Sequence, residues 1–485
     1  MICISVTPES RQLAKVDILN ASRQCDLIEV CLDRLIKEPD VKDMLDGAKK
    51  PVLVSCRRNT DGGQFQGTED ERQALLRQAI LAGPAYVELD LDMARRIPRF
   101  GKTQRVISYT SLHRPLGNVD EVFDEAVAAQ ADVLKFTWPT ETLEAAWPLL
   151  AAVSQKRSVP IVGLGLGSCG LSFSLLGRKY GSPWIYAALE KGMEAFPGQP
   201  TVGELDDIYR WRQVGTKTRF IGLAGFGDAQ VMTAKVFNAG FDHLQLNTRC
   251  LPFDFKSLDQ LPRMLDILKI PAILATGDTG QRLTGLATQR DDIATEANFA
   301  DLLVKQADGW HAHNVIWKVA LRALENRLSQ TATGDRPLDR RNAVIVGGGG
   351  LAHSLALGIQ KRSGLVSICA GDDQEGQRIA RQSGARFVPS AQLYDSLFDV
   401  VVLTTTSLDQ GNRKQPVNPS LLRPDLTVLD LVQFPTDSPL TGEARDRSCR
   451  LIEPAEFFAD YLGNLFKSLT GHELPVEAFA MGLAE

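Results

Sequence analysis

Short apolar runs alternate with longer amphipathic segments throughout residues 1–213, and this alternation restricts the fold more than any other feature of the chain. Helical segments such as Glu69–Ala82 and Val119–Ala129 separate the apolar runs. Eight of these runs are predicted strands: Ile2–Val6, Leu27–Val30, Pro51–Ser55, Tyr86–Leu91, Arg105–Tyr109, Val133–Phe136, Pro160–Leu164 and Trp184–Ala187. Eight strand–helix units are typical of a (β/α)8 barrel, in which the carboxyl ends of the strands face one active-site mouth.

Two further α/β patterns follow the predicted barrel, at residues 218–330 and 338–455. The second of them opens with the apolar strand Asn342–Val346, which runs into four glycines and then a helix. A glycine turn between a strand and a helix predicts a Rossmann domain that binds a dinucleotide. Residues 456–485 are expected to form helices that return to the 218–330 domain.

The composition is that of an ordinary soluble globular protein, with a net charge of −5, 23% charged residues and 44% hydrophobic residues. Mixed charge signs argue against a nucleic acid as partner, and no apolar stretch is long enough to predict a membrane span. The N-terminus lacks a basic segment followed by an apolar one, so we expect no secretory signal and a cytoplasmic location. None of the eight cysteines lies in a C-x-x-C pair or at zinc-ligand spacing, so we expect reduced thiols and no metal.

Two cationic residues follow predicted strands at the mouth of the barrel. Lys135 ends the run Ala131–Leu134, where burial would favour the neutral, nucleophilic amine that forms a Schiff base with a ketone. A rim lysine whose amine reaches solvent is the alternative. Arg57 precedes the turn Gly62-Gly63, and its guanidinium suits a substrate carboxylate, with a solvated loop arginine as the alternative.

These positions lie in motifs that resemble type I 3-dehydroquinate dehydratase over nearly all of the first domain. The matching stretches are Ile28–Asp33, Arg57–Gly63, Tyr86–Asp90, Ala131–Lys135, Gly170-Leu171 and Phe196–Gln199. The resemblance implies that Lys135 forms an imine with the ketone of 3-dehydroquinate and that water is eliminated to give 3-dehydroshikimate. It also implies substrate binding by Glu29, Arg57 and Gln199 and a catalytic carboxylate at Asp90.

The sequence departs from this family at several positions where the family carries functional side chains. Thr110 replaces the histidine of a Ser-Tyr-His motif, and threonine cannot shuttle a proton near neutral pH. His113 is the one histidine of this domain, and we assign it as a replacement catalytic base, with a solvent-facing loop histidine as the alternative. Cys31 and Ser174 stand in place of family arginines, and Ala195 in place of a serine.

Residues 220–485 resemble shikimate dehydrogenase, and the order of the two parts is that of plant-type bifunctional enzymes. The matching stretches are Phe220–Leu223, Leu251–Phe255, Ala297-Asn298, Gly347–Ala352, Leu429–Leu440 and Leu469–Pro475. The resemblance implies substrate binding by Asn298. The implied cofactor-binding residues are Gly347, Gly349, Gly350, Leu351 and Ala352. Asp372 stands where the family carries an arginine for the 2′-phosphate of NADP, which favours NAD over NADP.

The dehydrogenase-like part also lacks family groups. Gly225–Gln230 replaces the paired serines that hold the substrate carboxylate, and Ile273–Arg282 contains no lysine at the catalytic position. The partner aspartate falls on His313, and a substrate glutamine falls on Tyr461. His311 and His313 would supply an imidazole, with a structural or solvated histidine pair as the alternative.

We therefore predict a bifunctional enzyme that dehydrates 3-dehydroquinate through a Schiff base and reduces 3-dehydroshikimate to shikimate with NAD or NADP. The alternative is a non-catalytic or substrate-shifted paralogue that binds metabolites or partners, because several family positions are substituted. The expected ligand is a small cyclic hydroxy-carboxylate, with neither a nucleic acid nor a membrane as partner. The sequence leaves the oligomeric state open, a homodimer being one candidate.

Overall fold

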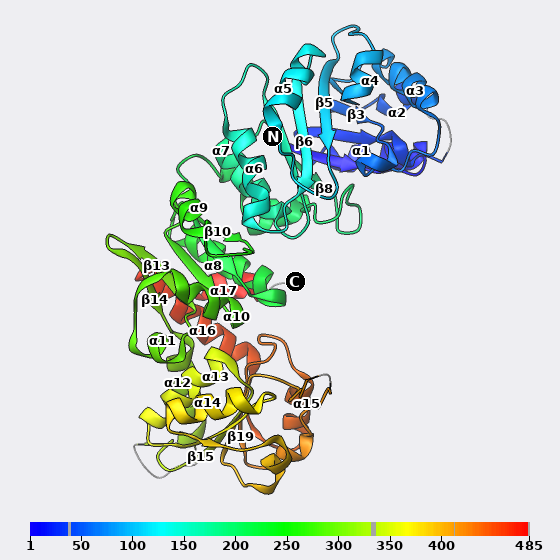
Figure 1. Cartoon of the computed structure of the whole chain (residues 1–485). Helices are drawn as coiled ribbons and strands as arrows, with labels where there is room; N and C mark the ends of the chain where they lie inside the picture. Colours follow the sequence, from blue (N-terminus) through cyan, green and yellow to red (C-terminus); the bar gives the residue numbers. More distant parts are fainter. Residues whose placement is uncertain (37–39, 331–335, 412, 484–485) are drawn as a thin grey trace. The chain divides into compact units, whose positions relative to one another are not determined.

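The structure is a computed structural model that describes residues 1–36, 40–330, 336–411 and 413–483, and the chain divides into two compact units (Figure 1). The first unit consists of Met1–Arg219 and Asn247–Leu261, and the second of Phe220–Leu246 and Pro262–Glu485. The second unit contains most of the 218–330 domain predicted from the sequence and all of the predicted Rossmann domain.

Eight parallel strands form the centre of the first unit, in the order β7-β6-β5-β4-β3-β2-β1-β8. They are β1 (Ile2–Val6), β2 (Leu27–Cys31), β3 (Val52–Ser55), β4 (Tyr86–Asp90), β5 (Gln104–Thr110), β6 (Val133–Pro139), β7 (Ile161–Leu166) and β8 (Ile185–Ala188). The edge strands β7 and β8 contact each other, so the sheet is a nearly closed barrel. The predicted barrel is confirmed, and each strand begins within one residue of its prediction.

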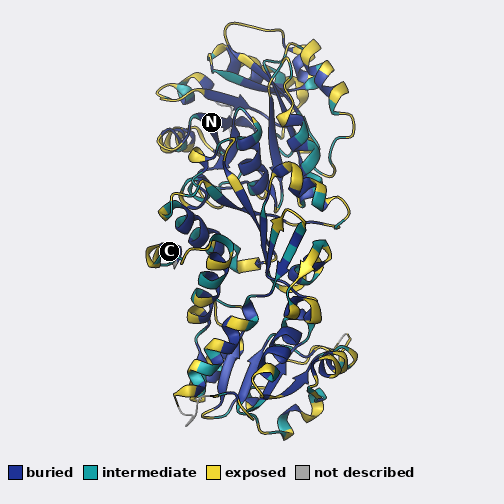
Figure 2. Cartoon of the chain, turned by 90° about the vertical axis from the view of Figure 1, so that its left-hand side faces the viewer, coloured by how far each residue is buried: buried dark blue, intermediate teal, exposed yellow. Residues whose placement is uncertain are grey.

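Helices follow most of the barrel strands. They are α1 (Arg11–Ala21), α2 (Val41–Leu45), α3 (Glu69–Leu81), α4 (Leu91–Arg96), α5 (Val119–Ala128), α6 (Leu143–Ser154) and α7 (Gly170–Tyr180). The start of α3 shows why these segments are helical: Thr68 and Glu71 form a capping box, and three acidic residues occupy the first turn. Figure 2 shows buried strands surrounded by helices whose outer faces are exposed.

The second unit begins with a mixed sheet in which β9 (Arg219–Ala224), β11 (Ala272–Ala275), β13 (Leu302–Gln306), β14 (Gly309–His313) and β12 (Ala287–Arg290) are neighbours in this order. The helices of this part are α8 (Gln230–His243), α9 (Leu261–Leu268), α10 (Gly277–Leu283), α11 (Asp292–Ala297) and α12 (Ile316–Ser329). The remaining strand, β10 (Thr248–Pro252), belongs to the Asn247–Leu261 segment of the first unit.

A second, fully parallel sheet has the strand order β17-β16-β15-β18-β19-β20. Its strands are β15 (Asn342–Val346), β16 (Leu365–Cys369), β17 (Arg386–Phe387), β18 (Val400–Leu403), β19 (Thr427–Asp430) and β20 (Arg450–Ile452). The helices are α13 (Gly349–Lys361), α14 (Asp373–Ser383), α15 (Pro439–Asp446), α16 (Pro454–Thr470) and α17 (Val476–Leu483), and α17 packs on α8. From β15 the strands are added first toward one edge of the sheet, as β16 and β17, and then toward the other edge, as β18 to β20. This is the strand order of a Rossmann domain, so that prediction is confirmed.

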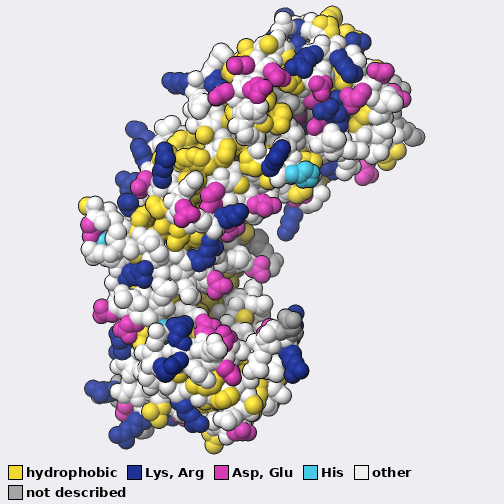
Figure 3. All heavy atoms as spheres, viewed as in Figure 1, with side chains coloured by type: hydrophobic (Ala, Val, Ile, Leu, Met, Phe, Trp, Pro, Cys, Tyr) yellow, Lys and Arg dark blue, Asp and Glu magenta, His cyan; other side chains and the backbone are white. Residues whose placement is uncertain are grey.

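The surface carries both charge signs. On the face shown in Figure 3, Lys and Arg side chains are interspersed with Asp and Glu side chains. None of the described helices combines the length and the apolar character needed to cross a bilayer.

Candidate active sites

Lys135 lies at the centre of the barrel, on β6, and its side chain is completely buried. Its Nζ atom is 2.8 Å from Oε2 of Glu88 on β4 and 3.9 Å from Oε1 of Glu29 on β2. The ring of Tyr186 on β8 lies beneath the ammonium, 4.3 Å from Nζ to the ring centroid. Lys135 is therefore an interior lysine held by two carboxylates and not a rim lysine that reaches solvent.

Arg57 completes this buried cluster just beyond the end of β3. Its Nη2 donates to Glu29, its Nε lies 3.4 Å from Oε1 of Glu88, and its guanidinium stacks over Phe196 at 4.9 Å. Two carboxylates and two cations share the barrel interior, so the formal charges of the cluster balance. The desolvation cost of burying any one of these ions without a partner of opposite charge would be too large for a stable fold.

Electrostatic attraction within the cluster outweighs the cost of burial. Burial by itself would raise the pKa of Glu29, but Arg57 and Lys135 lower the pKa of that carboxyl to about 2. Burial opposes the charge of Arg57 as well, yet Glu29 and Cys31 raise its pKa well above the ordinary value. Arg57 is therefore a permanently charged, buried cation and not a solvated loop arginine.

Gln199 extends the cluster toward β1. Its Nε2 donates to Ser5 Oγ at 3.2 Å, and Ser5 Oγ donates to Oε2 of Glu29 at 2.6 Å. Its Oε1 accepts the Ala195 N–H at 2.9 Å, which fixes the orientation of the amide. The structure thus brings together four of the predicted site residues: Glu29, Arg57, Lys135 and Gln199.

Asp90 and His113 do not join this cluster. Asp90 accepts the Met93 N–H at 3.0 Å as the N-cap of α4 and pairs with the buried Arg72 at 2.7 Å, and these contacts hold it as a structural carboxylate. His113 is exposed on the loop after β5. Thr110, at the end of β5, is half-buried. His113 is therefore a solvent-facing loop histidine in this structure, which was the alternative to a replacement catalytic base.

Glu88 is the residue that the sequence interpretation passed over. It lies two residues before Asp90 on the same strand, and both alternate with the buried apolar residues Val87 and Leu89. That period of two was the available signal, because an acidic residue at an inward position of a buried strand needs a cation inside the barrel. The proximity of Lys135 itself depends on the register between β4, β5 and β6.

Small, buried side chains occupy the two positions where the dehydratase family carries arginines, Cys31 and Ser174. Cys31 lies 3.8 Å from Arg57 Nη1, and the Ser174 hydroxyl donates to the Gly170 carbonyl within α7. Neither adds a cation to the cluster, so Arg57 and Lys135 are the positive groups described at its centre.

The glycine turn of the second unit has the backbone geometry of a phosphate-binding loop. Gly347 and Gly349 have φ values of +130° and +78°, and Gly348 precedes the N-terminus of α13 without a capping side chain. A Cβ atom at Gly350 would lie 2.5 Å from Cβ of Phe299, so this glycine permits close packing of the helix. The turn fits a pyrophosphate, although the Gly349 N–H already donates to Glu375 Oε1 at 2.9 Å.

The other predicted cofactor residues follow this turn along the chain. Leu351 lines an adjacent cleft and Ala352 is buried. Asp372 is exposed and accepts the Gln374 N–H at 2.9 Å as the N-cap of α14. It lies three residues beyond the end of β16.

A cleft of about 350 Å³ opens beside the glycine turn, a volume suited to a small ligand. Its polar lining side chains are those of Asp228, Thr276, Thr404, Gln433 and Tyr461, and no lysine, arginine or histidine is among its described lining residues. The cleft therefore offers hydrogen bonds but no cation to a carboxylate ligand.

Asn298, His311 and His313 are not among these lining residues. Asn298 is exposed at the end of α11, and its Oδ1 accepts from Thr284 and Arg290. His311 pairs with Asp308 at 2.8 Å on β14, and burial lowers the pKa of the neighbouring His313. Within the described residues, no group of three His, Cys, Asp or Glu side chains is arranged to hold a metal ion.

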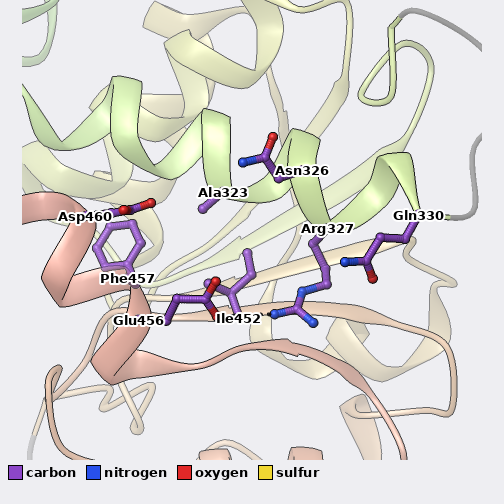
Figure 4. Close-up of a pocket in the computed structure, with 8 residues that line it drawn as sticks. All are labelled: Ala323, Asn326, Arg327, Gln330, Ile452, Glu456, Phe457 and Asp460. Carbon is purple, nitrogen blue, oxygen red and sulfur yellow. Dashed lines mark ion pairs between the residues drawn. The ribbon is translucent and has the colours of Figure 1, made fainter.

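A smaller cavity of about 70 Å³ lies between α12 and α16 (Figure 4). Arg327 on α12 and Glu456 on α16 face each other across it, with Nη2 and Oε2 3.6 Å apart. The volume holds little more than water, and no predicted site residue lines it.

Asp301 is a buried carboxyl behind the cleft. Its oxygens accept the N–H groups of Val315 and Ile316 at 2.7 Å each and the Tyr461 hydroxyl at 3.3 Å. Burial raises the pKa of Asp301 to about 7, even though these hydrogen bonds favour the charged form.

We expect Asp301→Asn to flatten the pH dependence of stability between pH 4 and pH 8. The folded pKa is raised, so between about 3.9 and 7 the folded protein holds a proton that the unfolded chain has released. The free energy of unfolding therefore falls as pH rises across this window, by on the order of 4 kcal/mol. Urea titrations at several pH values measure it, with exposed Asp460→Asn as the control; an unchanged slope in Asp301→Asn would contradict the assignment.

Comparison with known proteins finds a family whose model matches the first unit. Residues 2–216 match the model of the family described as Type I 3-dehydroquinase. Over 43% of its length, the chain is 26% identical to 3-dehydroquinate dehydratase of Methanocaldococcus jannaschii and covers 98% of that protein.

The similarity also extends beyond residues 2–216. The chain is 23% identical, over 99% of its length, to the chloroplastic bifunctional 3-dehydroquinate dehydratase/shikimate dehydrogenase of Arabidopsis thaliana and covers 83% of it. Among solved structures, dehydroquinate dehydratase and shikimate dehydrogenase from S. pombe aligns with 100% of the chain and 98% of its own, at 16% identity and a TM-score of 0.44. Shikimate dehydrogenase from Aquifex aeolicus aligns with 56% of the chain and 98% of its own, at 18% identity and a TM-score of 0.48. The resemblance to the fused enzymes that the sequence motifs indicated is confirmed.

Proposed function

We propose that the chain is a bifunctional enzyme that dehydrates 3-dehydroquinate to 3-dehydroshikimate in the barrel and reduces 3-dehydroshikimate to shikimate in the second unit. The observation that carries the proposal is the buried Lys135 amine, 2.8 Å from the Glu88 carboxylate, inside a dehydroquinase-family barrel. The whole-chain similarity to bifunctional enzymes supports the second activity.

In the barrel, Lys135 must be neutral before it attacks a ketone, and Glu88 is the carboxylate placed to accept its proton. The amine adds to the carbonyl carbon, and loss of the carbonyl oxygen as water forms the imine. The imine acidifies the neighbouring C–H; a base removes that proton, and the hydroxyl on the next carbon leaves as water. Hydrolysis of the imine then releases the unsaturated ketone and the free Lys135 amine.

Proton transfer during the elimination requires a group other than Thr110 or the exposed His113. We assign this role to Glu88, because the other carboxylate of the cluster, Glu29, is held ionised by Arg57 and Lys135 and has a pKa of about 2. Arg57 then faces the substrate carboxylate from the mouth of the barrel. The lower basicity of a carboxylate relative to imidazole predicts a slow dehydratase.

Borohydride trapping tests the barrel chemistry. Reduction during turnover of 3-dehydroquinate should convert the imine into a stable secondary amine on Lys135, detectable by peptide mass spectrometry. A chain that turns over substrate without an adduct on this lysine would contradict the Schiff-base mechanism.

The second activity needs a nicotinamide cofactor, which would supply the hydride when bound at the glycine turn. The backbone amides of Gly349 and Gly350 would hold its pyrophosphate, and the Asp372 carboxylate would accept from a ribose diol and repel a 2′-phosphate, which favours NAD. The cleft lined by Thr276, Gln433 and Tyr461 would hold the substrate hydroxyls through hydrogen bonds. A cytoplasmic location and a homodimer remain predictions.

A further inference from the structure

The carboxylate of Glu375 lies directly on the glycine turn of the second unit. Its Oε1 accepts the Gly349 N–H at 2.9 Å, and a Cβ atom added at Gly348 would lie 2.7 Å from Oε2. Glu375 belongs to the first turn of α14, so the sequence gives no local reason for it to reach the start of α13. The contact exists because α13 and α14 pack together and Gly348 has no side chain in the way.

This carboxylate takes the place where the fold normally binds an anion. The N-terminus of α13 has no capping side chain, so the charge of Glu375 satisfies one free amide and the positive end of the helix dipole. Arg378, one turn further along α14, places Nη2 3.8 Å from the same Oε1 and forms an ion pair with it. In βαβ units of this type the pyrophosphate of a dinucleotide uses these same amides.

A bound pyrophosphate and Glu375 cannot share this position, because both would place negative charge on one amide. Asp372 and Asp373 add further acidic groups at the start of α14. A dinucleotide must therefore displace the Glu375 carboxylate and break a charge-assisted hydrogen bond before it binds.

We propose that Glu375 is the residue that sets nucleotide affinity in the second unit, by occupying the pyrophosphate position of the glycine turn until a diphosphate ligand displaces it. The inference rests on the proposed nicotinamide-dependent activity for its ligand class. The proposal predicts that Glu375 lowers the affinity for ligands that carry a diphosphate and leaves the affinity for ligands that contact only the adenosine side unchanged.

Titration of the full chain with NAD, ADP and adenosine by calorimetry tests this proposal in the wild type, Glu375→Gln and Glu375→Ala. Loss of one charge-assisted contact should lower the Kd for NAD and ADP by about tenfold in Glu375→Ala, with a smaller decrease in Glu375→Gln, which keeps an acceptor oxygen. The Kd for adenosine should stay unchanged. Glu477→Gln removes an equal charge from an exposed position of α17 and should leave all three affinities at the wild-type value.

Hydrogen exchange supplies a readout that needs no ligand. Peptides that cover residues 347–352 should exchange faster in nucleotide-free Glu375→Ala than in the wild type, because the Gly349 amide loses its acceptor. Unchanged exchange, unchanged NAD affinity, or no NAD binding by any variant would overturn the proposal. Tight NAD binding by Glu375→Ala without reduction of 3-dehydroshikimate would instead leave the proposal standing and refute the reductase function.

Discussion

Replacement of Lys135 by methionine is expected to lower the dehydratase kcat by a factor of roughly 10³ or more. Methionine has a similar length and fits an apolar site, but it has no nitrogen to attack the ketone. The borohydride adduct should disappear together with turnover. Steady-state formation of the conjugated product, followed by its ultraviolet absorbance, measures the effect.

Two further variants separate chemistry from folding in this experiment. Exposed Lys102→Met in the same unit should retain full activity. Glu88→Gln should retain Lys135 yet turn over more slowly, because it removes the carboxylate that lies within hydrogen-bond distance of the amine. Hydrogen exchange of barrel peptides shows whether Lys135→Met is folded. A folded Lys135→Met protein that keeps its activity would rule out the covalent mechanism.

Substitution of Glu29 by glutamine is expected to destabilise the first unit by about 3–5 kcal/mol. Glu29 is completely buried and contacts Arg57 and Ser5, with Lys135 3.9 Å away. Glutamine removes the charge but not the shape, so two buried cations would face the single carboxylate of Glu88. Urea denaturation measures the loss, and hydrogen exchange of peptides from β2 to β6 assigns it to the barrel.

The acid sensitivity of the same carboxyl gives an independent readout. The folded pKa of Glu29 is depressed to about 2, so its stabilising contribution is complete above the unfolded value of about 4.3 and is lost as pH falls toward 2. That contribution is on the order of 3 kcal/mol, and Glu29→Gln should lack this part of the acid dependence.

Controls for Glu29 use one exposed pair and one double variant. Asp120→Asn, which breaks the pair between exposed Asp120 and Arg157, should leave stability within experimental error. The double variant Glu29→Leu/Arg57→Met removes both buried charges and should be more stable than the sum of its single changes. Additive losses would mean that the two charges do not depend on each other.

The barrel could be predicted from the sequence because its signal is local. Each strand is a segment of four to seven residues with apolar side chains at its centre, and the helical segments between strands and the eight-fold repetition are properties of neighbouring residues. The same holds for the strand, glycine turn and helix at Asn342–Lys361. Lys135 and Arg57 were identified for the same reason, since each follows an apolar run of the sequence, whereas Glu29 and Gln199 came from the resemblance to the dehydratase family.

Partners across the barrel could not be predicted in this way. Asp90 and Glu88 lie two residues apart on one strand, and only the reach of the longer side chain and the register of β4 to β6 decide that Glu88 meets Lys135. Asp90 instead meets Arg72 and caps α4. His113 was the one imidazole that the sequence offered to the barrel, and the direction of its loop leaves it exposed.

By itself the sequence determined the order and kind of the elements and most of the charged groups at the strand ends, because hydrophobic periodicity and turn chemistry act over a few residues. Only the tertiary structure decided which charges neutralise one another inside the barrel and that Glu375 covers the glycine turn. Those pairings join residues 26 to 47 positions apart, and their free energies depend on distances and burial that exist only after the strands and helices have packed.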